Sequence, residues 1–286
     1  MRILYRFLSE GALCRMLPVI LGRFHEREGR EVEPIIRVRD LYKIFHIGEN
    51  EVYALNGLSF DVYQGEFIAI VGTSGSGKST CLNMLAGLEK PSKGEIEIAG
   101  ERIDRMNEGE LVRFRRLNVG FIFQSYNLVA SMNAVENVSL PLMFRGVPEE
   151  ERLRESEKYL ELMGIGDQRD HLPNQMSGGQ QQRVGIARAL VIEPKIIFAD
   201  EPTGNLDSHT TEEVLALMQR IVRERNNTLI MVTHDPNIAA WSDRQLRVVD
   251  GKIVETVIQK ESPIEKRIYE EKHDWPFVKT EALTSS

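Results

Sequence analysis

The sequence has few cysteines, no long hydrophobic stretch and no excess of positive charge. Its 286 residues include two cysteines, Cys14 and Cys81. Two are too few for a disulfide framework, which favours a reducing compartment. No run of about 18 uncharged apolar residues occurs, so the sequence predicts no membrane-spanning helix. The formal net charge of −7 gives no general attraction to nucleic acid, and no nucleic-acid partner is expected.

The composition is that of an ordinary globular protein, with 42% hydrophobic and 28% charged residues. The chain is long enough for one large domain or two small ones. Residues 1–33 form an N-terminal extension with three open interpretations: an amphipathic segment on a membrane or partner, a helix packed on the domain, or an upstream extension if translation starts later. After Gly251 the chain becomes charged and irregular, and we predict a marginal helix and disorder in a tail over 255–286.

The pattern of apolar residues predicts an α/β fold. Ile35–Asp40 and Leu58–Tyr63 alternate apolar and polar residues, as half-buried antiparallel strands do. Phe67–Val71, Lys195–Asp200 and Thr228–Thr233 are instead continuous apolar runs, typical of strands buried on both faces. Helical spacing between the last two runs completes a strand–helix–strand unit, so the sequence predicts a parallel sheet with a separate N-terminal antiparallel part.

A helical subdomain is predicted as an insertion between sheet strands, at about 125–189. Helical patterns dominate there, and Pro148 with three following acids opens a helix that ends near Gly164. The main domain therefore spans 34–254 in this interpretation.

A glycine-rich loop follows the first buried strand and precedes a helical run from Cys81 to Leu88. It has the phosphate-loop pattern in the required context of strand before and helix after. Glycines let successive backbone N–H groups surround a phosphate, and the helix N-terminus adds partial positive charge. Lys78 can bridge the outer phosphates and Ser79 can ligate Mg²⁺. The candidate residues for ATP binding are Gly72, Ser74, Gly75, Ser76, Gly77, Lys78, Ser79 and Thr80.

Two adjacent acids close the second buried strand. Asp200 and Glu201 would emerge beside the phosphate loop, because carboxyl ends of parallel strands share an edge. A lone Asp-Glu pair is usually a solvated turn, but this pair follows a buried strand in a chain that also carries Lys78. We predict that Asp200 holds Mg²⁺ and that Glu201 polarises the attacking water.

A second glycine-rich helix start lies about a hundred residues after the first. Ser177 and Gln180 have capping-box spacing, and Gly178 and Gly179 leave the backbone N–H groups accessible to an anion. The sequence Met176–Arg183 resembles the signature loop of the ABC transporter ATPases, with Met176 in place of the usual leucine. Methionine is similar in volume and apolarity, so this loop should still function.

The resemblance covers about 34–254 and implies further roles. Gln124 resembles the glutamine that contacts Mg²⁺ and senses the membrane partner, and Asp207 lies in a segment that crosses the dimer interface. His234 matches the histidine that bonds the γ-phosphate. Phe45 occupies the position of the aromatic that stacks on adenine, with Tyr42 an alternative; either could instead be core. The implied catalytic residues are Glu201, His234, Gln124 and Lys78, and the implied Mg²⁺ ligands are Ser79, Gln124 and Asp200.

Within that family the motifs resemble the lipoprotein-release, macrolide-efflux and cell-division branch. The resemblance implies a homodimer that closes around ATP and Mg²⁺ and drives a separate membrane permease, in export or mechanotransmission. It also implies a cytoplasmic location, peripheral on the inner face of the cell membrane. The alternative is a soluble or regulatory ABC ATPase that gates a partner without transport. The apolar residues Leu128, Val129, Met132, Val135 and Val138 could dock a permease helix or form the core of the helical subdomain.

Overall fold

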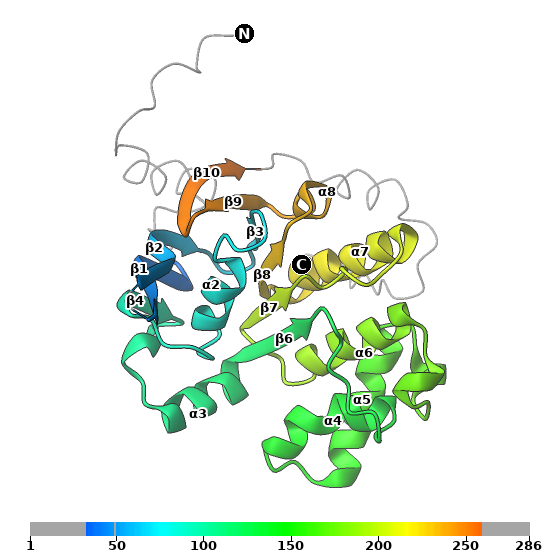
Figure 1. The fold of residues 1–286 in the computed structure, drawn as a ribbon. Coiled ribbons are helices and arrows are strands. Elements are labelled where there is room, and N and C mark those ends of the chain that lie inside the picture. The colour runs from blue at the N-terminus through cyan, green and yellow to red at the C-terminus, as the bar shows by residue number, and fades with distance from the viewer. Residues whose placement is uncertain (1–32, 49, 259–286) are drawn as a thin grey trace, which may run out of the picture.

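The computed structural model describes residues 33–48 and 50–258, which form two sheets and a group of helices (Figure 1). The predicted extension over 1–33 therefore lies almost wholly outside the described residues, as does the tail beyond 258. No helix in the described part is long and apolar enough to cross a membrane.

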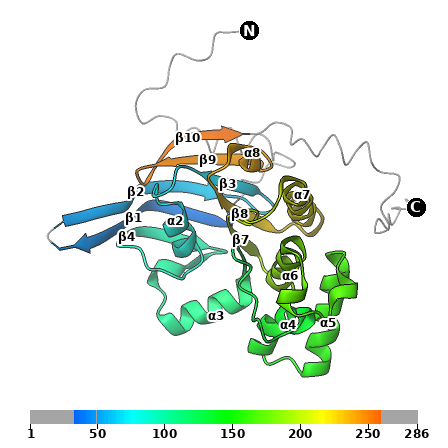
Figure 2. The ribbon, with the colours of Figure 1, turned by 45° about the vertical axis from the view of Figure 1, so that its right-hand side comes forward.

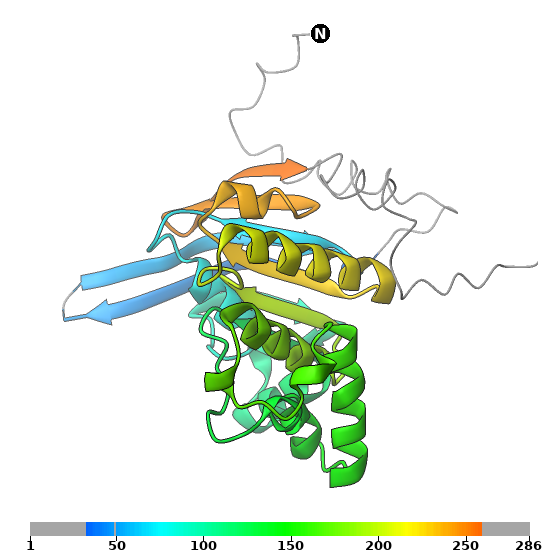
Figure 3. The same ribbon diagram turned by 90° about the vertical axis from the view of Figure 1, so that its right-hand side faces the viewer.

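The first sheet is antiparallel and has the order β2-β1-β4-β5. Its strands are β1 (Ile36–Ile47), β2 (Asn50–Val62), β4 (Lys93–Ile98) and β5 (Glu101–Arg102). The two predicted N-terminal strands are confirmed, but both are longer than their alternating segments. The extra length is a hairpin that projects beyond the rest of the fold, where the side chains are exposed and the alternation fades (Figures 2 and 3).

The second sheet has the order β10-β9-β3-β8-β7-β6. Its strands are β3 (Phe67–Val71), β6 (Val119–Phe123), β7 (Ile196–Asp200), β8 (Thr228–Thr233), β9 (Arg244–Val249) and β10 (Lys252–Ile258). All neighbours are parallel except β9 and β10. The register aligns Phe123 with Asp200, Asp200 with Val232, and Val71 with Thr233. Four strands therefore end together at one edge.

The continuous apolar strands are buried on both faces, as their pattern predicted. In β7, Ile196 and Phe198 pack into the core between the two sheets, whereas Ile197 and Ala199 pack into the core under the helices. Helix α2 (Lys78–Leu85) contributes Leu82 to the core between the sheets. A polar residue in these strands would therefore be buried whichever face it occupied.

The helical subdomain follows β6 and consists of α4 (Ala134–Phe144), α5 (Glu149–Leu162) and α6 (Gly178–Leu190). Helix α6 also packs against β6, so it joins this subdomain to the sheet. The remaining helices are α3 (Glu108–Asn118), α7 (Ser208–Arg225), α8 (Pro236–Ala239) and three short 3-10 turns, Ile103–Arg105, Gly166–Gln168 and Pro173–Gln175. Figure 1 shows α4 to α6 grouped below the sheet and α7 beside it.

The prediction of irregular chain after Gly251 is wrong for 252–258. These residues form β10, an edge strand paired with β9, so the sheet continues past the predicted boundary at 254. The hairpin turns at Asp250 and Gly251, both with positive φ. Asp-Gly is a strong hairpin signal, but the charges that an edge strand carries on its exposed side concealed the strand.

A buried ion pair of the second sheet is also hydrogen-bonded to the first sheet. Arg244 of β9 donates to both carboxylate oxygens of Glu66, at 2.7 and 2.9 Å, and to the backbone oxygen of Asp61 in β2. The side chains of Arg244 and Glu66 are only 3% and 12% exposed. Arg247 on the same strand pairs with Glu255, but those side chains are 61% and 53% exposed.

We therefore expect Arg244→Met to destabilise the protein by about 3–5 kcal/mol, since it leaves a buried carboxylate unpaired. The matched variant Arg247→Met should cost less than about 1 kcal/mol. Urea unfolding followed by circular dichroism measures both free energies. Equal unfolding midpoints for the two variants would contradict this account of how the sheets are joined.

Candidate functional site

The loop between β3 and α2 surrounds a cavity of about 640 Å³. Its two closest turns require glycine. A Cβ at Gly72 would lie 2.3 Å from the backbone oxygen of Val248, and one at Gly77, where φ is +99°, would lie 2.2 Å from that of Ala54. The cavity is lined by Ala54, Thr73, Ser74, Gly75, Gly77, Lys78, Ser79, Thr80, Glu201 and His234.

The cavity thus brings together most of the residues that the sequence predicted for ATP. Gly72 and Ser76 support the loop from beneath, where the buried Ser76 hydroxyl has no hydrogen-bond partner. Ala54 and Thr73 line the cavity without having been predicted. Thr73 lies inside the phosphate-loop string and its backbone oxygen accepts from Lys78 Nζ at 2.8 Å. No sequence pattern marks Ala54, which tertiary packing brings here from β2.

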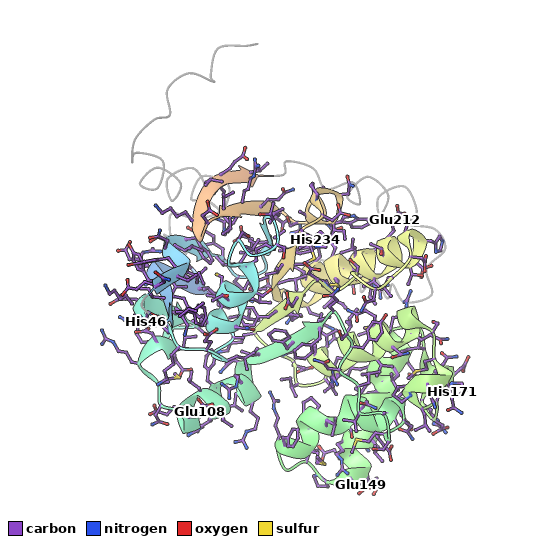
Figure 4. The ribbon with its side chains drawn as sticks, viewed as in Figure 1. His46, Glu108, Glu149, His171, Glu212 and His234 are labelled. Atoms are coloured by element: carbon purple, nitrogen blue, oxygen red, sulfur yellow. The ribbon has the colours of Figure 1, made fainter. Side chains whose placement is uncertain are left out.

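The ends of β7 and β8 place charged groups at the mouth of the loop. Ser79 Oγ donates to Asp200 Oδ1 at 3.3 Å, and His234 Nδ1 lies 2.8 Å from Glu201 Oε1. Figure 4 labels His234 at the end of β8, whereas His171 and Glu149 lie on the helical part. The strand register brings the acids and the histidine together, because Asp200 ends β7, Glu201 follows it, and His234 follows β8. Ser79 comes from the start of α2.

Glu201 is held in a left-handed conformation with φ of 43°. Its backbone N–H donates to Val232 O at 3.0 Å, which extends the β7–β8 pairing by one residue, and its carbonyl accepts from Gly204 N. A non-glycine residue in this region costs of order 1 kcal/mol and such strain concentrates at functional sites. The turn aims the carboxylate at His234 instead of continuing the strand.

The electrostatics of the loop mouth favour a bound cation and a bound anion together. Burial raises the pKa of Asp200, as does the charge of Glu201, while Ser79 and Lys78 counter the rise. Burial also lowers the pKa of Lys78, against the attraction of Glu201 and Asp200. The loss of hydration therefore destabilises the charged forms of both Asp200 and Lys78. A phosphate at Lys78 and a divalent cation at Asp200 would compensate for that loss.

Gln124 follows β6 and packs against the turn after Glu201. A Cβ on Gly204 would lie 2.7 Å from Gln124 Nε2, and Asn205 Nδ2 donates to the Gln124 backbone oxygen at 3.0 Å. Gln124 does not line the cavity of the nucleotide loop. Gln124 therefore lies beside the turn that follows Asp200 and Glu201, outside the cavity that Glu201 lines.

The second glycine-rich helix start lies elsewhere on the chain. Ser177 caps α6: its hydroxyl accepts from Gln180 N at 3.3 Å, and its own N–H donates to Gln180 Oε1 at 2.8 Å. Gly178 and Gly179 pack against Tyr126 and Thr210. Asp207 caps α7 and accepts from Thr210. No residue of this group lines the cavity at Lys78, so one chain holds two separate glycine-rich helix starts.

Phe45 is exposed, with 40% of its surface accessible, on the β1–β2 hairpin. The ammonium of Lys43 lies 5.2 Å from its ring centroid. The ring is therefore not part of the core, and one of its faces already receives a cation. Tyr42 is half-buried, and its hydroxyl lies 2.9 Å from the position of a Cβ on Gly57.

Residues 55–204 match the family model of ABC transporters. This chain belongs to the ABC transporter family. It is an ABC ATPase, and the fold class inferred from the sequence is confirmed. An uncharacterised ABC transporter ATP-binding protein of Thermotoga maritima is 47% identical over 222 residues, which cover 78% of this chain and 94% of that protein.

The resemblance to the macrolide-efflux branch is also confirmed at the level of sequence. The macrolide export ATP-binding/permease protein MacB of Escherichia coli K12 is 43% identical over 221 residues, or 77% of this chain. The match spans 34% of MacB, so this ABC ATPase corresponds to about a third of that protein. The dimeric ATP-binding cassette MJ0796, solved with ADP and Pi in a post-hydrolysis state, is 39% identical, with a TM-score of 0.74 over 79% of this chain and 99% of that one.

The raised pKa of Asp200 predicts a gain in stability when its charge is removed. Because folding raises this pKa, ionised Asp200 destabilises the nucleotide-free protein at neutral pH, and the cost fades as pH falls through the folded pKa. We expect Asp200→Asn to raise the free energy of unfolding at neutral pH, with a difference from the parent that shrinks as the pH is lowered through the raised pKa of Asp200. Urea unfolding at several pH values measures it.

The control is Asp167→Asn, which changes an exposed aspartate on the helical subdomain and should leave stability unchanged. An Asp200→Asn variant that was less stable than the parent across the whole pH range would contradict the assignment of a destabilising charge.

Proposed function

We propose that this chain closes as a homodimer around two molecules of ATP with Mg²⁺, hydrolyses them, and thereby moves a separate membrane permease of the export or mechanotransmission type. The observation that carries the proposal is the pair of anion-binding helix starts. One opens into the cavity at Lys78, and the other, at Ser177, does not line that cavity. A second copy could bring its Ser177 to the first copy's cavity.

The residues around the cavity suit ATP with Mg²⁺. The phosphate loop offers its backbone N–H groups and Lys78 to the phosphates. Lys78 Nζ donates a hydrogen bond to Thr73 O of the same loop, and a phosphate oxygen can replace that acceptor. Ser79 Oγ and Asp200 Oδ1, 3.3 Å apart, are the hard oxygen ligands that Mg²⁺ prefers. Gln124 is the third proposed ligand. When bound, Mg²⁺ neutralises charge on the phosphate oxygens.

Glu201 and His234 carry the proposed hydrolysis step. Glu201 orients a water molecule whose oxygen attacks the γ-phosphorus. The bond from that phosphorus to the bridging oxygen breaks, ADP leaves with the bridging oxygen, and the water's proton passes by way of Glu201 to the phosphate. His234, 2.8 Å from Glu201 Oε1, fixes the carboxylate and can turn to the γ-phosphate when ATP binds.

The remaining site residues belong to the dimer interface in this proposal. Ser177, Gly178, Gly179 and Gln180 of one protomer cover the γ-phosphate held by the other, and Asp207 crosses the interface. Their positions support this assignment. Ser177 caps α6 and Asp207 caps α7, and the two helix starts contact each other through Gly179 and Thr210. Phe45 stacks on adenine from the projecting hairpin.

Glu201→Gln tests the catalytic half of the proposal. Removing the carboxylate should lower the ATP turnover rate about a hundredfold or more, since general-base catalysis contributes 10²–10⁴-fold. ATP binding should survive, so the variant is expected to accumulate as an ATP-bound dimer. Phosphate release measures the rate and size-exclusion chromatography with light scattering measures the mass. Parental turnover, or a monomer at saturating ATP, would contradict the assignment.

A partner surface is proposed between the ends of α3 and α4. Among the exposed apolar side chains are Val112 and Leu117 of α3, Val129 before α4, and Met143 and Phe144 at its end. Val135 and Val138 are instead buried in the helical core, and Leu128 packs against it. The predicted apolar stretch therefore contributes these three residues to the core, whereas Val129 is exposed.

Arginines join the two helices at this surface. Arg116 donates to Phe144 O at 3.2 Å, and Arg145 donates to Arg116 O and Leu117 O at 2.9 and 3.2 Å. These bonds hold the exposed Phe144, with 66% of its surface accessible, in a fixed position. A permease helix could insert there, which would place the chain on the cytoplasmic face of the membrane.

We expect Phe144→Glu to detach the chain from its permease without changing the ATPase activity of the purified protein. The matched control is Val254→Glu, which changes an apolar side chain of similar exposure, 57%, on β10. The measurement is co-sedimentation of tagged chain with membranes of its host, with identification of the integral membrane protein that elutes with it. Equal recovery of both variants would rule out this surface.

A further inference from the structure

The loop after Gln124 is strained and is held by one arginine. Tyr126 and Asn127 are both in the left-handed region, with φ of 56° and 49°. Neither is glycine, and two consecutive residues in this region are strained unless surrounding contacts hold them. Arg188 of α6 donates to the backbone oxygens of both, to Tyr126 O at 2.7 Å and to Asn127 O at 2.6 Å. The strained turn therefore presents two carbonyls to a single guanidinium.

Arg188 is not engaged by an acid. Within 33–48 and 50–258, Arg188 forms no ion pair with a carboxylate, and burial lowers its pKa. A half-buried arginine without an anion depends on its backbone acceptors, and its planar fork can serve two of them at once. The two hydrogen bonds from a charged donor can each contribute more than a neutral hydrogen bond does.

The same loop also contacts the start of α6. A Cβ on Gly178 would lie 2.8 Å from the Tyr126 hydroxyl, and one on Gly185 would lie 3.8 Å from Tyr126 O. Gly178, Gly185 and Arg188 share one helical face, at spacings of seven and three residues. Tyr126 is therefore held against α6 at its ring end and at its carbonyl end, along about 10 Å of helix between Gly178 and Gly185.

A buried amide lies on this face as well. Gln182 is fully buried, and neither its Oε1 nor its Nε2 has a hydrogen-bond partner among the residues that the structure describes. A buried amide without partners costs free energy, which a shift of the neighbouring backbone would recover. Gln182 can therefore form new hydrogen bonds if the loop after Gln124 and helix α6 move into a second arrangement.

We propose that Arg188 is a positioning residue that fastens the loop after Gln124 to α6, so that Gln124 at one ATP and Ser177 at the partner's ATP move as one unit. The inference rests on the proposed function, because it requires the ATP-bound dimer. Ser177 caps the start of α6, and Arg188 lies near the end of the same helix. A displacement of the loop after Gln124 at one ATP therefore displaces the signature loop at the partner's ATP. This physical connection couples the two sites.

The test compares Arg188→Met with Arg115→Met. Arg115 is also half-buried and also donates to a backbone oxygen, that of Gly87, but it lies on α3 away from α6. Each change is made alone and in the Glu201→Gln background. Three quantities are measured: affinity of the monomer for fluorescent ADP, the ATP concentration at half-maximal dimerisation, and the Hill coefficient of ATP hydrolysis.

For Arg188→Met we expect unchanged ADP affinity, because Lys78 and its loop are untouched. The ATP concentration for dimerisation should rise about tenfold, as expected for the loss of charged hydrogen bonds that hold the signature helix in place. The Hill coefficient should fall toward about 1. Arg115→Met should match the parent in all three. Arg188→Lys, which keeps the charge but can reach fewer acceptors, should lie between.

Arg188→Met with the parent's dimerisation midpoint and Hill coefficient would overturn the inference. A parallel loss of monomer ADP affinity would also overturn it, since that is general damage to the fold. If Arg188→Met does not fold, Arg188→Lys decides by the same criteria. If Glu201→Gln itself stays monomeric with ATP, the proposed function fails. If Glu201→Gln dimerises and the added Arg188→Met leaves its dimerisation midpoint unchanged, the inference alone fails.

Discussion

The parallel pairing of β6, β7, β8 and β3 is the constraint on which the site depends. Its register places Phe123, Asp200, Thr233 and Val71 at one edge. Each strand is followed by a residue of the site or by the phosphate loop. Because hydrogen-bonded strands cannot slip by one residue without turning every side chain to the other face, the buried cores on both sides of β7 keep these groups together.

Strain appears where the chain leaves that edge. Glu201 departs from β7 with positive φ and turns its carboxylate to His234. Tyr126 and Asn127, three and four residues after β6, also have positive φ, and Arg188 holds their carbonyls. In both places a continued strand would carry the polar groups away from the cavity. The surrounding backbone hydrogen bonds stabilise the strained conformations, so the site is aligned before a ligand arrives.

Helix α6 connects the two parts of the molecule. Its apolar residues pack in the core shared with the sheet, its first turn carries Ser177, and its Arg188 reaches back to the loop after β6. A helix is stiff along its axis, so its two ends move together. In the proposed dimer, α6 would connect the group that binds a protomer's own nucleotide to the group that is presented to its partner.

The sequence alone determined the family, the fold class and most of the residues in the cavity. Short continuous apolar runs bounded by turn residues are typical of strands buried on both faces, and the phosphate loop, the acids at 200 and 201 and His234 each lie at the end of such a run. These are local patterns, and their meaning is set within a few residues. The limits of β1 and β2, and the strand β10, were not determined in this way, since exposed edge and hairpin residues lack the periodicity that burial imposes.

Only the tertiary structure decided which distant residues meet. Ala54 lines the cavity because β2 passes beneath Gly77, and no local pattern records this. Val135 and Val138 are buried while Val129 is exposed, although all three belong to one apolar stretch, because exposure depends on what packs against each face. Arg188 follows the signature by ten residues and looks like a surface arginine in sequence. Its role depends on two carbonyls about sixty residues earlier, which packing across the fold brings within 3 Å.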